Sequence, residues 1–148
     1  MRTAKLSFFF VLLCLTGIAS LSYSNPEIEK KIASFYGLPP GQQVVVREYR
    51  SHADLPAEFS SIPDFAAGAA DPETGEMFLF SSMTGSYPFG SMEQVYAHEL
   101  SHIYLYRAAG FRVPRWFDEG VAMHLAGEWG GRDDLYLALA LPGIARGN

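Results

Sequence analysis

The sequence predicts a small α+β domain, and three observations support this. Segments rich in β-branched and aromatic residues come early in the region after residue 24. Apolar residues at helical spacing dominate the second half of that region, and the chain contains no internal repeat or heptad run. Strands followed by helices are typical of helices packed on a small, mostly antiparallel sheet. We therefore expect a single domain of this kind over residues 25–148.

The first 24 residues have the layout of an export signal. The start MRTAK carries two positive charges, the uncharged run LSFFFVLLCLTGIA follows, and small residues come next. Cleavage is expected after Ala19 or after Ser24, and the sequence fits both positions. We therefore expect an exported protein, periplasmic or secreted and bacterial, that meets a membrane only if this segment is retained.

The charge balance of the remaining chain argues against a nucleic-acid partner. Removal of residues 1–24 leaves 9 Lys and Arg against 16 Asp and Glu, a net charge of −7, and no cysteine. Phosphate binding draws on concentrated Lys and Arg, which this sequence lacks. Without disulfides, an exported domain of this size relies on packing, to which a bound metal can add stability.

The first elements after residue 24 are expected to be a helix and then three strands. An Asn-Pro-Glu start predicts a short amphipathic helix over residues 26–37. The β-branched run at residues 44–49 predicts a buried strand, and a short helix is expected over residues 52–59. Two strands around an Asp-Pro-Glu-Thr-Gly turn predict a hairpin over residues 65–82. Residues 83–90 are rich in Gly, Ser and Pro and predict a loop.

The clearest helix signal spans residues 92–109. Ser91 and Gln94 match a capping box at its start, and Gly110 supplies its end. Apolar residues lie almost all round this helix, which is typical of a central, buried helix.

Further helices are expected after this central one. Pro114 begins a helix that ends at residue 127 or 130, and another is expected over residues 133–141. The sequence stops soon afterwards, as a C-terminally short form of the domain would. Trp116 and Phe117 are expected to pack in the core, because aromatic residues near a helix start usually pack against the sheet.

The segment HELSH, at the middle of the central helix, predicts a metal site. His98 and His102 lie about 40° apart in direction and about 6 Å apart along the axis, so both can bind one ion. Glu99 lies about 100° from His98, an angle that lets it hold a metal-bound water. Two imidazoles and a carboxylate on a buried helix are costly unless a divalent cation satisfies them. The alternative is an accidental match whose histidines only form hydrogen bonds.

A third ligand is expected from the next helix. The longer metzincin motif requires a glycine and a histidine where this chain has Leu105 and Ala108, which excludes that class. Glu119 follows His102 by seventeen residues within PRWFDEGVA, and two His with one Glu leave the fourth zinc position open. Asp118 is the competing ligand. Glu119 is preferred because its longer side chain reaches further from a neighbouring helix.

HELSH and PRWFDEGVA together resemble the gluzincin zinc metallopeptidases, in particular the short bacterial peptidase MA-like domains. In these domains HE-hydrophobic-x-H is followed by a Pro-x-Trp-hydrophobic-x-Glu-Gly-hydrophobic-Ala helix. The match covers roughly residues 44–128 in the order of its elements, and the two short blocks are its specific part. It implies a zincin-like fold and one Zn²⁺ ion. It also implies His98, His102 and Glu119 as zinc ligands and Glu99 as general base.

The resemblance implies a peptidase. In this expectation a zinc-activated water attacks the scissile carbonyl, and Glu99 accepts its proton and returns it to the leaving amine. The resemblance implies that the strand at residues 76–82 is the edge strand along which a peptide or protein substrate aligns, and the alternative is an ordinary core strand. Tyr136, Tyr87 and His124 are candidates for stabilising the tetrahedral intermediate. His124 lies about 140° around its helix from Glu119, so a solvated or packing role is favoured for it, and the same role is favoured for His52, which is far from the motif. The residues expected to bind substrate are Met77, Phe78, Leu79, Phe80 and Tyr136.

Two other functions remain open at this point. The first is a zinc-stabilised, catalytically incomplete peptidase-like binding domain in the cell envelope. The second is an envelope protein without a metal, in which the HELSH motif is accidental. Measurements of metal content and of peptide cleavage distinguish these two functions from the peptidase.

Overall fold

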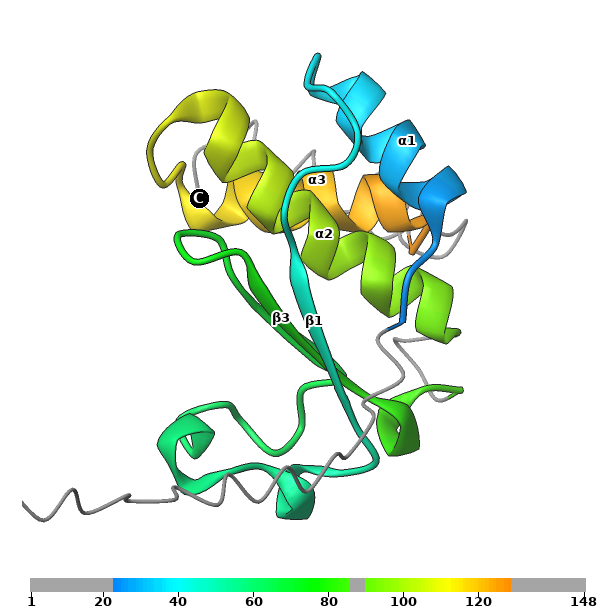
Figure 1. Cartoon of the computed structure of the whole chain (residues 1–148), viewed down its shortest axis with the longest axis vertical. Coiled ribbons are helices and arrows are strands. Elements are labelled where there is room, and N and C mark those ends of the chain that lie inside the picture. The colour runs from blue at the N-terminus through cyan, green and yellow to red at the C-terminus, as the bar shows by residue number, and fades with distance from the viewer. Residues whose placement is uncertain (1–22, 86–89, 129–148) are drawn as a thin grey trace, which may run out of the picture.

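The computed structural model describes residues 23–85 and 90–128 of the chain. Within these residues, three α-helices and a three-stranded mixed sheet form a small α+β fold, which confirms the expected fold class (Figure 1). The expectations for the signal segment up to residue 22, for Tyr87, for Tyr136 and for a helix over residues 133–141 lie outside the described residues. The helices are α1 (Pro26–Phe35), α2 (Met92–Ala109) and α3 (Arg115–Ala126), and the strands are β1 (Val45–Tyr49), β2 (Gly68–Asp71) and β3 (Glu76–Phe80).

The sheet has the strand order β1-β3-β2. β2 and β3 pair antiparallel, which confirms the hairpin. β1 pairs with β3 in parallel, so the expectation of a mostly antiparallel sheet is wrong for one of the two strand pairs. The connection explains this, because the chain leaves β1, crosses to the far edge, and only then forms the hairpin that places β3 in the middle. Two short 3-10 turns in this crossing, His52–Asp54 and Ala57–Phe59, replace the single helix expected over residues 52–59.

β3 is the central strand of this sheet. The expectation that residues 76–82 form the edge strand for substrate is therefore wrong. The backbone of β3 is paired with β1 on one side and with β2 on the other. Its apolar side chains are buried in the core and are not available to a substrate. They are Met77 (0% exposed), Phe78 (5%), Leu79 (0%) and Phe80 (0%).

α2 is the central helix of the fold, as expected. Ser91 accepts a hydrogen bond from the N–H of Gln94 at its start, and Gly110 ends it in the left-handed conformation with φ 76°. The helix contacts α1, α3, β2 and β3. This burial on several sides is why the helix is apolar around almost its whole circumference.

α3 begins after Pro114, packs against α2 and ends at Gly127, which is left-handed with φ 70°. The shorter of the two expected ends is therefore correct. Among the described residues, no helix is both long enough and apolar enough to cross a membrane.

Trp116 and Phe117, in the first turn of α3, are 78% and 42% exposed, so the expectation that they pack in the core is wrong. Asp118, which contacts His102 of α2, and the buried Ala122 and Leu125 lie at the i, i+4, i+7 spacing of one face of α3. The two aromatic residues fall outside this face.

Candidate metal centre

α2 and α3 bring three metal-ligating side chains together, as the sequence predicted. His98, His102 and Glu119 each offer one ligand atom, and these atoms all lie within 4.8 Å of one another. His98 Nε2 lies 3.4 Å from Glu119 Oε2. Two ligands of a tetrahedral zinc ion, each at about 2.05 Å, are separated by about 3.3 Å. Two imidazoles and a carboxylate at this separation fit a divalent cation.

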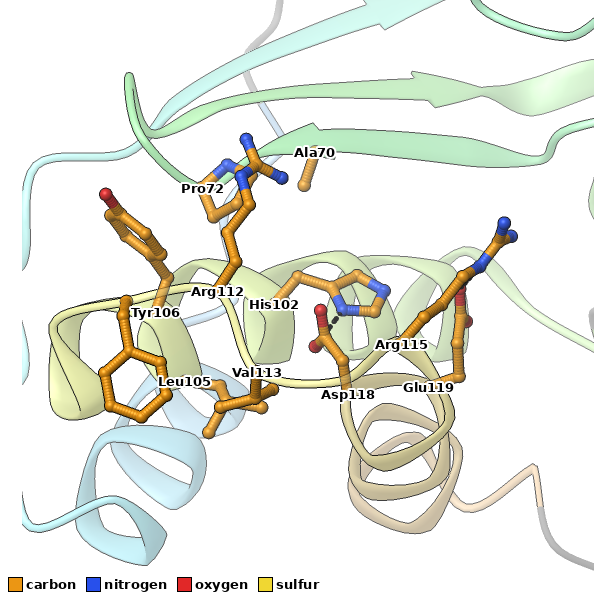
Figure 2. A pocket seen from close by; sticks show the side chains of 11 residues that line it. Ala70, Pro72, His102, Leu105, Tyr106, Arg112, Val113, Arg115, Asp118 and Glu119 are labelled. Atoms are coloured by element: carbon orange, nitrogen blue, oxygen red, sulfur yellow. Dashed lines mark hydrogen bonds and ion pairs between the residues drawn. The ribbon is translucent and has the colours of Figure 1, made fainter.

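Asp118, the competing ligand, contacts His102 on its Nδ1 side. Its Oδ1 lies 2.5 Å from His102 Nδ1 (Figure 2). Metal-ligating histidines almost always bond their second ring nitrogen to a carboxylate, a carbonyl or a water. The geometry therefore gives Asp118 the task of orienting the imidazole, and Glu119, one residue further along α3, completes the candidate metal group.

Glu128 orients the His98 imidazole as Asp118 orients that of His102. The sequence analysis did not predict this residue. Its Oε1 lies 3.0 Å from His98 Nδ1, and its side chain is 5% exposed. Gly127 ends α3 in the left-handed conformation, and the N–H of Glu128 closes the turn on the carbonyl of Met123 at 3.0 Å. The only available signal was an acid placed directly after a helix-ending glycine.

Carboxylates near His98 determine whether its imidazole carries a charge. Burial alone lowers the pKa of the imidazole, but the hydrogen bond that His98 donates to Glu128 and the charges of Glu99, Glu128 and Glu119 outweigh it and raise the pKa to about 9. The metal-free protein therefore carries a proton on His98 at neutral pH. A metal ion that binds this residue must displace that proton.

Glu99 is enclosed beside the metal group. It is 7% exposed, and burial raises the pKa of its carboxyl while His98 and His102 oppose that rise. Gly68 of β2 covers it closely, since a Cβ at Gly68 would lie 2.7 Å from Glu99 Cγ and 2.8 Å from Glu99 Oε1. Only a glycine allows the strand to approach this close. Sequence reasoning missed this contact, for which an isolated glycine within a strand was the only signal.

The other two described histidines lie apart from this group. His52 stacks on Phe80 with ring centroids 3.8 Å apart. His124 is exposed near the end of α3 and is not part of the metal group, so its position does not support it as a catalytic candidate. Both outcomes agree with the packing or solvated roles that the sequence favoured.

Comparisons of this chain with protein-family models, with curated proteins and with solved structures found no match. The functional interpretation therefore depends on the geometry and chemistry of the site itself.

Proposed function

We propose that this chain is an exported zinc-dependent peptidase of the gluzincin type with a zincin-like fold. The observation that carries the proposal is the convergence of His98, His102 and Glu119 from two helices, with the enclosed carboxylate of Glu99 beside them. A site with two His and one Glu is the ligand set of catalytic zinc, because it leaves a coordination position for water or substrate.

The chain's own residues would hold and orient the metal. His98, His102 and Glu119 would bind Zn²⁺, while Glu128 and Asp118 fix the two imidazoles through their Nδ1 atoms. When bound, zinc supplies Lewis acidity, which lowers the pKa of water and polarises a carbonyl.

Glu99 is the general base in this proposal. Burial raises the pKa of its carboxyl toward the range in which a base works best near neutral pH. Its carboxylate accepts a proton from the attacking water and later donates it to the leaving amine. The cover provided by Gly68 limits the access of bulk water to this carboxylate.

β2 takes over the substrate role that the sequence gave to β3. The N–H of Phe80 donates to the carbonyl of Ala67 at 2.9 Å, so residues 67, 69 and 71 face β3 in the alternating antiparallel pattern. Gly68 and Ala70 then direct their backbone groups to the other edge, which pairs with no strand among the described residues. An extended peptide can add there as a strand and pass beside Glu99.

Metal analysis combined with a peptide-library digest tests the proposal. We expect one zinc per chain and cleavage that is lost both with a chelator and in Glu99→Gln, while Glu99→Gln retains zinc. Glu48→Gln, at an exposed position of β1, is the matched control and should cleave normally. Full activity without zinc or in Glu99→Gln would refute the mechanism. Zinc retained without any cleavage by the wild type would favour the catalytically incomplete binding domain instead.

A further inference from the structure

A cavity of about 320 Å³ opens beside the metal group and shares His102 and Glu119 with it. Its other walls come from the end of β2, from the second half of α2, from the connection between α2 and α3, and from Arg115 and Asp118 in the first turn of α3 (Figure 2). This volume lies at the small end of the range for ligand pockets, which begins at about 300 Å³. It suits one or two substrate side chains.

The edge of β2 leads from Glu99 to this cavity. Gly68 lies against Glu99, and Ala70, two residues further along the strand, lines the cavity. Two residues of a strand span about 7 Å. A peptide that lies along β2 with its scissile bond beside Glu99 therefore places a residue one or two positions from that bond at the cavity.

Two arginines, Arg112 and Arg115, line this cavity. Figure 2 shows Arg112 and Arg115 pointing toward the strands on either side of the His102 imidazole. Arg112 donates from Nε to Glu73 at 2.9 Å, and Arg115 donates from Nε to Glu119 at 3.2 Å. These bonds use one of the five N–H donors of each guanidinium. Arg112 Nη2 also lies 3.8 Å from Asp71 Oδ1. The arginine side chains are 62% and 91% exposed, so their remaining donors can reach a ligand.

We propose that this cavity is the specificity pocket of the site and that it binds a carboxylate-bearing residue of the substrate. The inference rests on the proposed peptidase function. Leu105 and Val113 offer apolar surface for the methylene groups, and Arg112 and Arg115 offer charge-assisted hydrogen bonds to the carboxylate. Asp118 and Glu119 also line the cavity, but Asp118 bonds His102 and Glu119 belongs to the metal group. The two arginines are therefore the charged side chains of the lining that have donors left for a ligand, and such donors favour an anionic ligand. An acidic side chain and a terminal carboxylate share this chemistry.

Matched peptides test the pocket with the zinc-loaded full chain. One set carries Glu, Gln or Leu at either of the two positions on each side of the scissile bond and has an amidated C-terminus. A second set has no acidic side chain and ends in either a free carboxylate or an amide. We expect the carboxylate form of one set to be cleaved with about tenfold higher kcat/KM. The set that shows this effect identifies the source of the carboxylate. Equal cleavage of Glu and Gln peptides and of free-acid and amide peptides, or a preference for Leu, would overturn the proposal.

Arginine variants assign the preference to the pocket. Arg112→Gln and Arg115→Gln should each lower the carboxylate preference several-fold, and Arg112→Glu should shift it toward a Lys peptide. Arg50→Gln is the control, because this exposed arginine follows β1 at the other edge of the sheet. Thermal melts verify that each variant is folded. A preference that survives in both Arg→Gln variants would refute the assignment.

A binding measurement separates this inference from the proposed function. Fluorescein-labelled forms of the same peptides are titrated with zinc-loaded Glu99→Gln, and binding is followed by anisotropy. Carboxylate-selective binding without cleavage by the wild type would support the pocket and refute the peptidase. Cleavage by the wild type without carboxylate selectivity would support the peptidase and refute the pocket. The absence of both binding and cleavage would refute both.

Discussion

Replacing Gly68 by alanine tests whether the close approach of β2 holds Glu99 in place. The new Cβ would lie 2.7 Å from Glu99 Cγ and 2.8 Å from both Glu99 Oε1 and Val95 Cγ1. Carbon atoms in contact normally lie about 3.5 to 4.0 Å apart, so the overlap is about 1 Å. Either the carboxylate or the strand must move by a comparable distance.

The expected losses of stability and of catalytic rate in Gly68→Ala follow from this overlap. Overpacking of a well-packed site costs about 1–3 kcal/mol of stability. A displacement of about 1 Å at a reacting group costs about 100-fold in rate. We therefore expect Gly68→Ala to lower kcat/KM by about 100-fold, with zinc still bound because His98, His102 and Glu119 are not touched. Peptide hydrolysis, metal analysis and thermal melts on the same preparation measure the three quantities.

Gly120→Ala is the matched control, because a Cβ at this exposed position in α3 meets nothing within 4 Å. Alanine in a helix is about 0.5–1 kcal/mol more favourable than glycine, so this variant should remain active and melt slightly higher. The double variant Gly68→Ala/Val95→Ala relieves only the Val95 contact and should remain impaired. Wild-type activity in Gly68→Ala would refute the role given to this contact, and full rescue by Val95→Ala would show that Glu99 is not the affected group.

Three further predictions concern the metal group. Glu128→Gln should weaken zinc binding about 10- to 100-fold in a competition titration, whereas Glu48→Gln should not, because only Glu128 orients a ligand. Glu119→Gln should release zinc more completely than Asp118→Asn does, and the reverse order would make Asp118 the ligand. Zinc affinity should fall up to tenfold for each pH unit as the pH drops below about 9, because the pKa of His98 is raised to about 9 and its proton must leave. An affinity independent of pH between about 7 and 9 would contradict this charge assignment.

The parts of the fold that the sequence predicted well are governed by local chemistry. Ser91 and Gly110 mark the ends of α2 because capping depends on a few adjacent residues. The spacing of His98 and His102 places both on one helix face whatever the rest of the chain does. Glu119 could be predicted as the third ligand because the connection between α2 and α3 is short, so the two helices must pack as neighbours.

The errors concern relations between distant segments. Whether β3 is central or at an edge depends on how the chain crosses from β1 to β2, and no local pattern encodes that path. The continuous apolar run Met77–Phe80 is in fact typical of a strand buried on both faces, and the observed burial agrees with this. Glu128 lies 30 residues from His98, and Gly68 lies in another element from Glu99, so neither contact could be found by spacing.

Four carboxylates converge on two imidazoles where α2 meets α3, and this imbalance makes the site depend on a cation. The carboxylates are Glu99, Asp118, Glu119 and Glu128, and the imidazoles are His98 and His102. With all four acids ionised and both imidazoles neutral the cluster carries four negative charges, and gathering like charges is unfavourable. A proton on His98 offsets one charge, and a divalent cation offsets two.

A proton on His98 therefore partly replaces the charge of the metal, and this decides whether the stability of the metal-free protein rises or falls with pH. The pKa of His98 is raised from 6.5 to about 9 in the metal-free fold, so its stabilisation is present below 6.5 and is lost as the pH rises through about 9. The metal-free protein, prepared with a chelator, should melt at a lower temperature at about pH 10 than at about pH 7. The melting temperature of the zinc-loaded protein should fall much less over the same pH range. A chelated protein that gains stability over this range would show that the His98 proton does not stabilise the cluster.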